Sequence, residues 1–522
     1  MDSGLDIDFK SGAEVSYLFF VPTFLFLGFF FLIPLGNLLV LGFQGFSESI
    51  FQDPYLIYVI QFTYGQAFLS ALFSVLLGFF FAFLIKEWKI FGGKVLWRFG
   101  LLCSSLPSII VALGILGSWG KQTTVFGWKG LLLGHVFLNF AIPLRLIGNA
   151  LTDRERTSEL TALSLGMSRW RVFWKITLSS LQPSVVSSWI LAFLYSSTSL
   201  FIVLFLGGGP RFTTLEVALY EAIKLNLDNG RAIQIALLQA GVGAVLFFFY
   251  LRLQKKRKLE SESSDLQFFA PKNDWMRRMG GVFLWSLAGL ALGFPLISIF
   301  IDGVGDWSFL DWSDLLEAGL TTFGIALAVV VLSVLIVYPY LHYLYQVKSE
   351  RETSSWIWLI AIPQFFSSLV VALALSVFFP VVREMSWLSC LAVISTQTVF
   401  VIPLIQFPLR EGFLRLSRER NWIAQSLGAT GWQRWFWVEL PFMRRSLILS
   451  ALIGFGFSMG EVISILLFSP SGIKTLAMNI FQSMSRYRFQ EARATTVILL
   501  FSMITLFGIT GYLEDRDESS PH

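Results

Sequence analysis

Long apolar stretches that lack charged residues constrain the fold of this chain more than any other feature. Ten such windows contain no Asp, Glu, Lys or Arg, and two further windows contain one charged residue each. The twelve windows are 15–47, 54–85, 99–120, 130–151, 176–210, 232–251, 279–301, 318–347, 353–382, 385–409, 446–468 and 494–513. Each is long enough to span a membrane, because a helix needs about 20 predominantly apolar residues to cross a bilayer. The windows therefore predict an all-α polytopic membrane protein with twelve transmembrane helices, whose even number places both termini on the same side.

The composition excludes other classes of protein. Hydrophobic residues make up 55% of the 522 residues and charged residues only 14%, whereas a soluble domain carries about 25% charged residues. No soluble core could bury this much apolar surface, which excludes a soluble enzyme, a disordered protein and a disulfide-rich scaffold. Cys103 and Cys390 lie in separate apolar stretches and the three histidines are scattered, so we expect no disulfide framework, metal site or cofactor. The acidic first residues predict that the apolar segment after them is an anchor and not a cleaved signal peptide.

The sequence also repeats itself. Five landmark pairs recur in the same order at a nearly constant spacing, equal to half of the chain, which indicates a duplication. The pairs are Pro34 and Pro295, Pro107 and Pro363, Pro143 and Pro403, Gly166 and Gly428, and Thr214 and Thr475. We therefore expect two six-helix transmembrane domains, 1–252 and 277–522, joined by a polar cytoplasmic linker at 253–276. Because six is even, the two copies share one orientation and are parallel repeats, related by an axis along the membrane normal.

Basic residues cluster in a few of the predicted loops. They are concentrated at 86–98, 152–182, 411–446 and the start of the linker, whereas 302–317 carries five acidic residues and no basic residue. Cytoplasmic loops of membrane proteins are enriched in Lys and Arg, so this asymmetry predicts that the basic loops and both termini are cytoplasmic. The same rule accounts for the net charge of +5 without a nucleic-acid partner.

Two of the basic loops share one pattern. Residues 159–183 and 421–445 each contain a short helical stretch, a glycine and a second amphipathic stretch rich in Arg and Trp. Gly166 and Gly428 would allow a sharp turn between two short helices, because glycine enters positive φ freely. One interpretation is an interfacial helix on lipid headgroups, and the other is a docking site for a partner. The duplication favours docking, because a pair of identical partner subunits requires one matched loop in each half and lipid does not.

These loops resemble the EAA loop in the permeases of binding-protein-dependent ABC importers. The shared pattern is Ala, three residues and Gly, followed by an aliphatic residue and Leu-Pro. The matching residues are Ala162, Gly166, Ile176 and Leu178 in the first loop, and Ala424, Gly428, Val438, Leu440 and Pro441 in the second. The leading Glu of the family's loop is absent, since Leu160 and Trp422 occupy its positions and Glu159 lies one residue out of register. The departure removes one docking residue of the family and leaves the helix-glycine-helix pattern intact.

Four segments, 127–139, 206–222, 230–239 and 424–441, resemble the fused permeases of thiamine importers, of which the fused ferric-iron permeases are close relatives. The resemblance implies the MetI-like fold of a type I importer, which forms the pathway for a small solute across the bacterial cytoplasmic (inner) membrane. It also implies two partners, a cytoplasmic ATP-binding subunit dimer and an extracytoplasmic substrate-binding protein. The chain itself would not be an enzyme. The residues that would form the ATPase-coupling loops are Ala162, Gly166, Ser168, Arg169, Ala424, Gly428 and Thr430.

Three polar residues inside the apolar windows are candidates for the substrate pathway. Glu461 is well inside such a window, and because a charge at mid-bilayer costs about 2.5–3.5 kcal/mol it should face the bundle interior. A structural ion pair or hydrogen bond and a place in the pathway both fit Glu461, and we take the pathway as the hypothesis to test. His135 and Asn139 share one helical face and fit either an interhelical hydrogen bond or the same pathway. The alternative function is a stand-alone ion-coupled secondary transporter, which the parallel repeat and the matched cytoplasmic loops disfavour.

Overall fold

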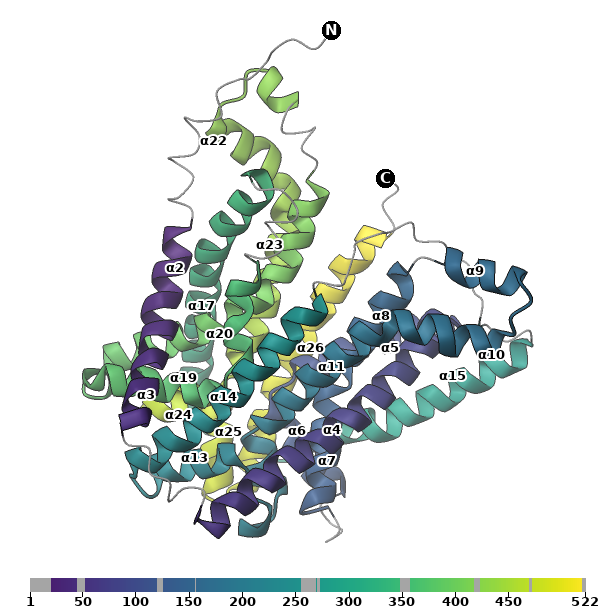
Figure 1. Ribbon diagram of the computed structural model, residues 1–522. Coiled ribbons are helices and arrows are strands. Elements are labelled where there is room, and N and C mark those ends of the chain that lie inside the picture. Colours follow the sequence, from purple (N-terminus) through teal and green to yellow (C-terminus); the bar gives the residue numbers. More distant parts are fainter. Residues whose placement is uncertain are drawn as a thin grey trace. The chain divides into compact units, whose positions relative to one another are not determined.

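The computed structural model describes residues 20–44, 52–119, 125–154, 156–254, 269, 273–347, 357–416, 423–468 and 472–518. These residues form helices and no strand (Figure 1). Within the described ranges, ten helices are long and apolar enough to cross a membrane. They are α2 to α3 (Val21–Gln44), α4 (Pro54–Lys86), α7 to α8 (Trp128–Asp153), α10 to α11 (Arg169–Ser197), α14 (Asn229–Gln254), α15 to α16 (Asp274–Val304), α17 (Trp312–Val347), α20 (Ser386–Arg415), α22 to α23 (Gly431–Gly460) and α26 (Phe489–Glu518). The chain is therefore a multi-pass, all-α membrane protein.

The prediction of twelve continuous helices holds for ten, and the two exceptions are the third window of each half. In the first half, α5 (Gly93–Ser105) and α6 (Ser108–Trp119) are separate helices. Leu106 between them is extended, with φ −71° and ψ 136°, because the proline that follows disfavours helical geometry. In the second half, the 3-10 segment η8 (Trp358–Phe365) meets α19 (Ser368–Phe378) at an angle of 95°. Both third segments are thus broken at corresponding places in the repeat.

The predicted fifth helix of each half also ends earlier than its apolar window. The long helices α11 (Leu178–Ser197) and α23 (Leu440–Gly460) stop, and the short helices α12 (Phe201–Leu206) and α24 (Ile463–Phe468) follow after a break. Glu461 lies in the second break and is extended, with φ −80° and ψ 122°. The expectation that Glu461 sits inside a continuous helix is therefore wrong, since it occupies the junction between two helices.

Short π-helical segments mark matched positions in the two halves. The described residues contain η2 (Gly28–Leu32) and its counterpart η6 (Gly289–Gly293), and η4 (Phe173–Thr177) and its counterpart η10 (Trp435–Glu439). The members of each pair have the same spacing in sequence as the landmark residues of the duplication. A π-helical turn is rare and often accompanies a functional site. The repeat therefore extends to local backbone geometry, and η4 and η10 lie within the two matched loops.

The chain forms two compact units that exchange their first spanning helices. The first unit contains Met1–Gln44, Leu316–Met478 and Gly508–His522, and the second contains Gly45–Leu315 and Asn479–Phe507. Each unit thus joins the first helix of one half to most of the other half. Residues 255–268 and 270–272, which make up most of the predicted linker, lie outside the described residues.

Close contacts hold each exchanged helix inside its unit. In the first unit, Thr23 Oγ1 on α2 donates a hydrogen bond of 2.8 Å to the carbonyl oxygen of Ile336 on α17. In the second unit, Ser298 Oγ on α16 donates to the carbonyl oxygen of Gly114 at 3.1 Å. A Cβ at Gly114 would lie 2.8 Å from the carbonyl oxygen of Pro295, so only glycine permits this approach of α6 to α16.

Candidate functional site

Two loops, residues 156–183 in the second unit and 423–445 in the first, form the candidate site, and we call them the docking loops. Each docking loop turns at a glycine in the left-handed region, with φ +86° at Gly166 and +82° at Gly428. Gly166 separates α9 (Thr157–Ser164) from α10 (Arg169–Val172), and Gly428 precedes α22 (Gly431–Arg434). The predicted positive φ at both glycines is confirmed.

Identical backbone hydrogen bonds close the two turns. The amides of the glycine and of the next residue donate to carbonyl oxygens three and five residues earlier, which is the Schellman ending of a helix. The bonds are Gly166 N to Leu163 O (3.0 Å), Met167 N to Ala162 O (3.0 Å), Gly428 N to Gln425 O (2.9 Å) and Ala429 N to Ala424 O (3.0 Å). The Ala-three residues-Gly spacing therefore has a backbone cause: the alanine carbonyl accepts the longer bond, and the glycine supplies the left-handed residue.

The second short helix of each docking loop begins at a capping residue. Ser168 Oγ accepts a hydrogen bond from the amide of Arg171 at 3.4 Å. Thr430 and Gln433 form a reciprocal capping box, in which the Thr430 amide donates to Gln433 Oε1 at 3.0 Å. Ser168 and Thr430 thus fix the direction of the second helix, and Arg169 lies exposed on it.

Large apolar side chains on the docking loops are exposed at matched positions. Leu165 and Leu427, each directly before the turning glycine, are 80% and 82% exposed, and Trp170 and Trp432 are 69% and 71% exposed. Both pairs have the same spacing in sequence as the two glycines. Large exposed apolar side chains are typical of surfaces that bind a partner, and Trp is enriched among the residues that dominate binding energy.

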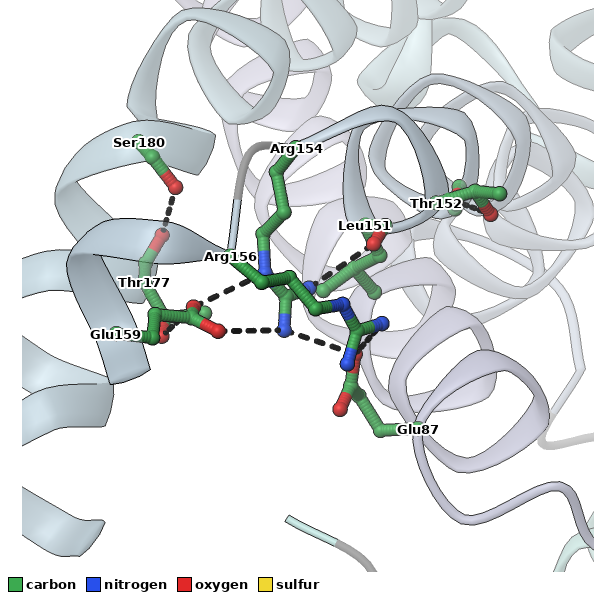
Figure 2. Close-up of polar contacts among 9 residues, drawn as sticks. Glu87, Leu151, Thr152, Arg154, Arg156, Glu159, Thr177 and Ser180 are labelled. Carbon is green, nitrogen blue, oxygen red and sulfur yellow. Dashed lines mark hydrogen bonds and ion pairs between the residues drawn. The ribbon is translucent and has the colours of Figure 1, made fainter. Parts of the chain in front are cut away.

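A buried charge network fastens the first docking loop to the helix bundle (Figure 2). Arg154 donates from Nη2 to Glu87 Oε1 at 2.9 Å and from Nε to Glu159 Oε1 at 3.0 Å. Arg156 Nη2 lies 3.2 Å from the same Glu87 oxygen. Thr177 Oγ1 donates to Glu159 Oε1 at 2.5 Å. All five residues are buried, so the two arginines and two glutamates neutralise each other away from solvent.

The network determines what Glu159 can do. Its side chain points inward from α9, toward Arg154 and Thr177 (Figure 2). It is therefore an internal anchor, and its carboxylate is not presented to a partner. Because Glu87 follows α4 directly and Thr177 ends η4, the network joins α9 to the second spanning helix and to the start of the fifth. Removing one member of a buried ion pair costs about 3–5 kcal/mol.

The second docking loop achieves the corresponding connection with different residues. Glu439 is the last residue of η10, as Thr177 is the last residue of η4 in the first half. Its Oε2 lies 2.7 Å from His342 Nε2 on α17, and its Oε1 accepts from Arg434 Nε on α22 at 3.2 Å. Glu439 thus links the π-helical segment directly to the second spanning helix, whereas in the first half Glu159 makes this link through Arg154 and Glu87. Sequence analysis noted Glu159 only as a residue out of register and missed Glu439, although an acid among so many arginines was a detectable signal.

The candidate pathway residues His135 and Asn139 lie on α7 (Trp128–Asn139) in the second unit. Asn139 Nδ2 donates to Ser196 Oγ on α11 at 2.9 Å, which is an interhelical hydrogen bond. His135 is buried, and neither of its ring nitrogens has a hydrogen-bond partner among the described residues. Their place in a substrate pathway stays a prediction. In the described part of the chain, no group of three or more His, Cys, Asp or Glu residues is placed to hold a metal ion.

Glu461, in the first unit, caps the start of α24. Its carboxylate accepts hydrogen bonds from the amide of Ile463 at 2.9 Å, from the amide of Ser464 at 3.1 Å and from the Ser464 hydroxyl. Gln397 Nε2 on α20 approaches the same carboxylate at 3.4 Å. This geometry explains how the bundle accommodates the acid, because each of these neighbours donates a hydrogen bond to it.

Comparison with known proteins relates this geometry to a family. Residues 74–259, which include the first docking loop, match the binding-protein-dependent transport system inner membrane component. The chain is 29% identical over 497 residues to the thiamine transport system permease protein ThiP of Escherichia coli (strain K12), covering 90% of this chain and 91% of the relative. It is 25% identical over 515 residues to ThiP of Haemophilus influenzae, covering 93% and 94%. A shorter match, 29% over 161 residues, relates 29% of this chain to 57% of the putrescine transport system permease protein PotI of Escherichia coli.

Proposed function

We propose that this chain, which carries the inner membrane component of binding-protein-dependent transport systems in residues 74–259, is the permease subunit of an ABC importer for a thiamine-type substrate. The similarity to thiamine permeases extends over about 90% of the chain, which supports this substrate over the ferric-iron alternative. The matched docking loops support an ATPase-driven importer over an ion-coupled carrier. The observation that carries the proposal is the occurrence of one docking loop, with the same turn and the same exposed Leu and Trp, in each half.

The docking loops indicate the first partner. A dimer of identical cytoplasmic ATP-binding subunits offers two equal binding sites, and this chain offers two equivalent surfaces. Leu165 and Leu427 would enter one subunit each, with Trp170 and Trp432 beside them. The chain would form the translocation pathway and carry out no catalysis, with ATP hydrolysed by the partner.

The proposal extends to orientation and to a second partner. Because the docking loops overlap the basic segments 152–182 and 411–446, they and both termini would face the cytoplasm of a bacterial cell. The acidic segment 302–317 would face outward, where a substrate-binding protein delivers the solute.

Valine in place of Gly166 or Gly428 tests the docking role. A Cβ at either glycine would have no heavy atom within 4 Å, so the fold meets only the cost of a left-handed β-branched residue, about 1–3 kcal/mol. We expect G166V and G428V to reach the membrane at normal abundance and to lose ATPase association and thiamine uptake. The matched control is G319V, because Gly319 on α17 also has open space around it but lies in an ordinary helical backbone.

The measurements are co-purification of the ATPase and uptake of labelled thiamine into proteoliposomes that contain the complete system. Normal uptake in both G166V and G428V would refute a docking role for these turns. The substrate is tested separately, by titrating the purified binding protein with thiamine and with ferric iron. Binding of iron and not of thiamine would overturn the substrate and leave the importer intact.

A further inference from the structure

Two turns, one before the last spanning helix of each half, adopt an unusual backbone conformation at matched positions. Leu227 has φ +52°, and its counterpart Tyr487 in the second half has φ +61°. A positive φ is uncommon for residues other than glycine and unfavourable for bulky ones. Each residue follows a short helix, α13 (Leu215–Lys224) or α25 (Leu476–Ser485). The conformation is therefore built into both halves, and glycine, which would adopt it without strain, is used in neither.

The second of these turns, Arg486, Tyr487 and Arg488, we call the Arg-Tyr-Arg turn. The amide of Tyr487 donates to the carbonyl oxygen of Met484 at 3.1 Å, and the amide of Arg488 donates to that of Ser483 at 2.8 Å. These are the two bonds of a Schellman ending, in which the left-handed position is normally glycine. The chain has placed a tyrosine there at the cost of backbone strain.

The side chains of the Arg-Tyr-Arg turn contribute little to the fold. Tyr487 is 80% exposed, and its ring makes one edge contact, with Phe489 at 6.1 Å between ring centroids. Arg488 lies 3.6 Å from Glu491 and remains mostly exposed, and Arg486 has no ion pair within the described part of the chain. These few local contacts do not account for a strained, exposed tyrosine between two exposed arginines, and Tyr and Arg are among the residues most enriched in binding hot spots.

The surroundings of the Arg-Tyr-Arg turn favour a protein over lipid as its partner. The preceding helix α25 is buried along almost all of its length, and α26 is mostly buried from Ala492 to Leu500. Apart from Phe489, which is 48% exposed, the residues on either side of the turn offer little apolar surface to lipid. On the same elements, Asn479 contacts Asp314 at 3.2 Å and Arg493 contacts Asp306 at 2.8 Å. The turn therefore belongs to the same side as the acidic segment 302–317, which is predicted to face outward.

The corresponding turn of the first half lacks the two arginines that flank the left-handed residue. Residues 225–230 read LNLDNG and contain one acid and no base, whereas 485–490 read SRYRFQ and contain two bases and no acid. Asp228 is already engaged, because its Oδ1 accepts from the amide of Arg231 at 3.0 Å. The basic turn is thus a distinctive feature of the second half.

We propose that the Arg-Tyr-Arg turn is a docking point for an acidic surface of the extracytoplasmic substrate-binding protein. The inference rests on the proposed importer function and names the chemistry of one of its partners. The two guanidinium groups attract and orient the acidic surface, and the ring of Tyr487 provides the apolar contact. The left-handed backbone holds that ring away from the helix end, where a partner can enclose it.

The test uses the complete permease–ATPase complex in lipid nanodiscs and the purified, thiamine-loaded binding protein. We expect Y487G to weaken binding about thirtyfold, which is the lower limit for a hot-spot residue, although glycine relieves the strain and should leave thermal stability equal or higher. We expect R486E with R488E to weaken binding at least as much and to reduce its dependence on salt. The matched control is L227G, which relieves the same strain in the other turn and should leave binding unchanged.

A photo-crosslinking amino acid in place of Tyr487 identifies the neighbour directly. Crosslinks to the binding protein at an acidic surface support the proposal, whereas crosslinks to lipid alone, or wild-type affinity in Y487G and the double variant, overturn it. ATPase co-purification is measured in every variant, because it should persist throughout. If the wild-type complex binds no binding protein at all, the importer function fails together with this inference.

Discussion

The buried network of the first docking loop makes a quantitative prediction. The variant E159T removes one of two carboxylates that balance two arginines, so the buried cluster changes from neutral to a net positive charge. Glu159 loses an ion pair of 3.0 Å with Arg154 and a hydrogen bond of 2.5 Å from Thr177. Breaking a buried pair costs about 3–5 kcal/mol. We expect the lower end, about 3 kcal/mol, because Arg154 keeps its contact with Glu87 at 2.9 Å.

The cost should appear in the docking loop and not in the whole bundle. If the ordered loop alone binds the ATPase, about 3 kcal/mol lowers its apparent affinity by up to about a hundredfold. We therefore expect E159T to be inserted normally, to release the ATPase on dilution and to lose thiamine uptake. The control is T161A, because Thr161 lies on the same short helix, is exposed and takes no part in the network.

The second half of the chain suggests a second substitution that should restore the function lost in E159T. Since Glu439 already places a carboxylate at the position of Thr177, the double variant E159T/T177E should restore a carboxylate beside Arg154. ATPase affinity and uptake per ATP hydrolysed should return toward wild-type values. Wild-type coupling in E159T, or a double variant no better than the single one, would refute the reasoning.

Two further predictions concern Glu461 and orientation. Because the Glu461 carboxylate caps a helix, E461Q should cost about 1 kcal/mol of stability and leave the KM for thiamine unchanged. Reduced uptake at unchanged thermal stability would instead place Glu461 in the pathway. Orientation is tested in a chain with Cys103 and Cys390 replaced, with an impermeant thiol reagent applied to intact spheroplasts. The reagent should label S308C and not S168C, and the reverse result would invert the orientation.

The sequence predicted the parts of the fold that depend on local composition. Ten apolar windows became spanning helices, and Gly166 and Gly428 adopted the positive φ expected of them. The breaks in the third and fifth segments were missed because hydropathy continues through them. A break at Glu461 is stable only because Gln397 and Ser464 satisfy the carboxylate, and those contacts form in the folded bundle.

The sequence predicted the two docking loops but not the buried contacts that attach them to the helix bundle. Glu87 and Glu159 lie far apart in the sequence, and no local pattern joins them before α4 and α9 come together. The exposed Leu165 and Leu427 were overlooked because a leucine in a helical loop usually faces inward. A comparison of the two loops position by position would have found them, since the leucines match at the same spacing as the glycines.

The exchange of first helices has a consequence for how the protein is made. The hydrogen bond between Thr23 and Ile336 joins residues 313 positions apart. Synthesis at about 5–20 residues per second means that α2 emerges roughly 15–60 seconds before the helix it packs against. During that interval α2 lies in the membrane without α17. A chain truncated after the first half lacks α17 altogether. Because the two halves are fused into one chain, every copy of α2 is made together with one copy of the second half. The helix against which α2 packs is therefore always synthesised in the same chain.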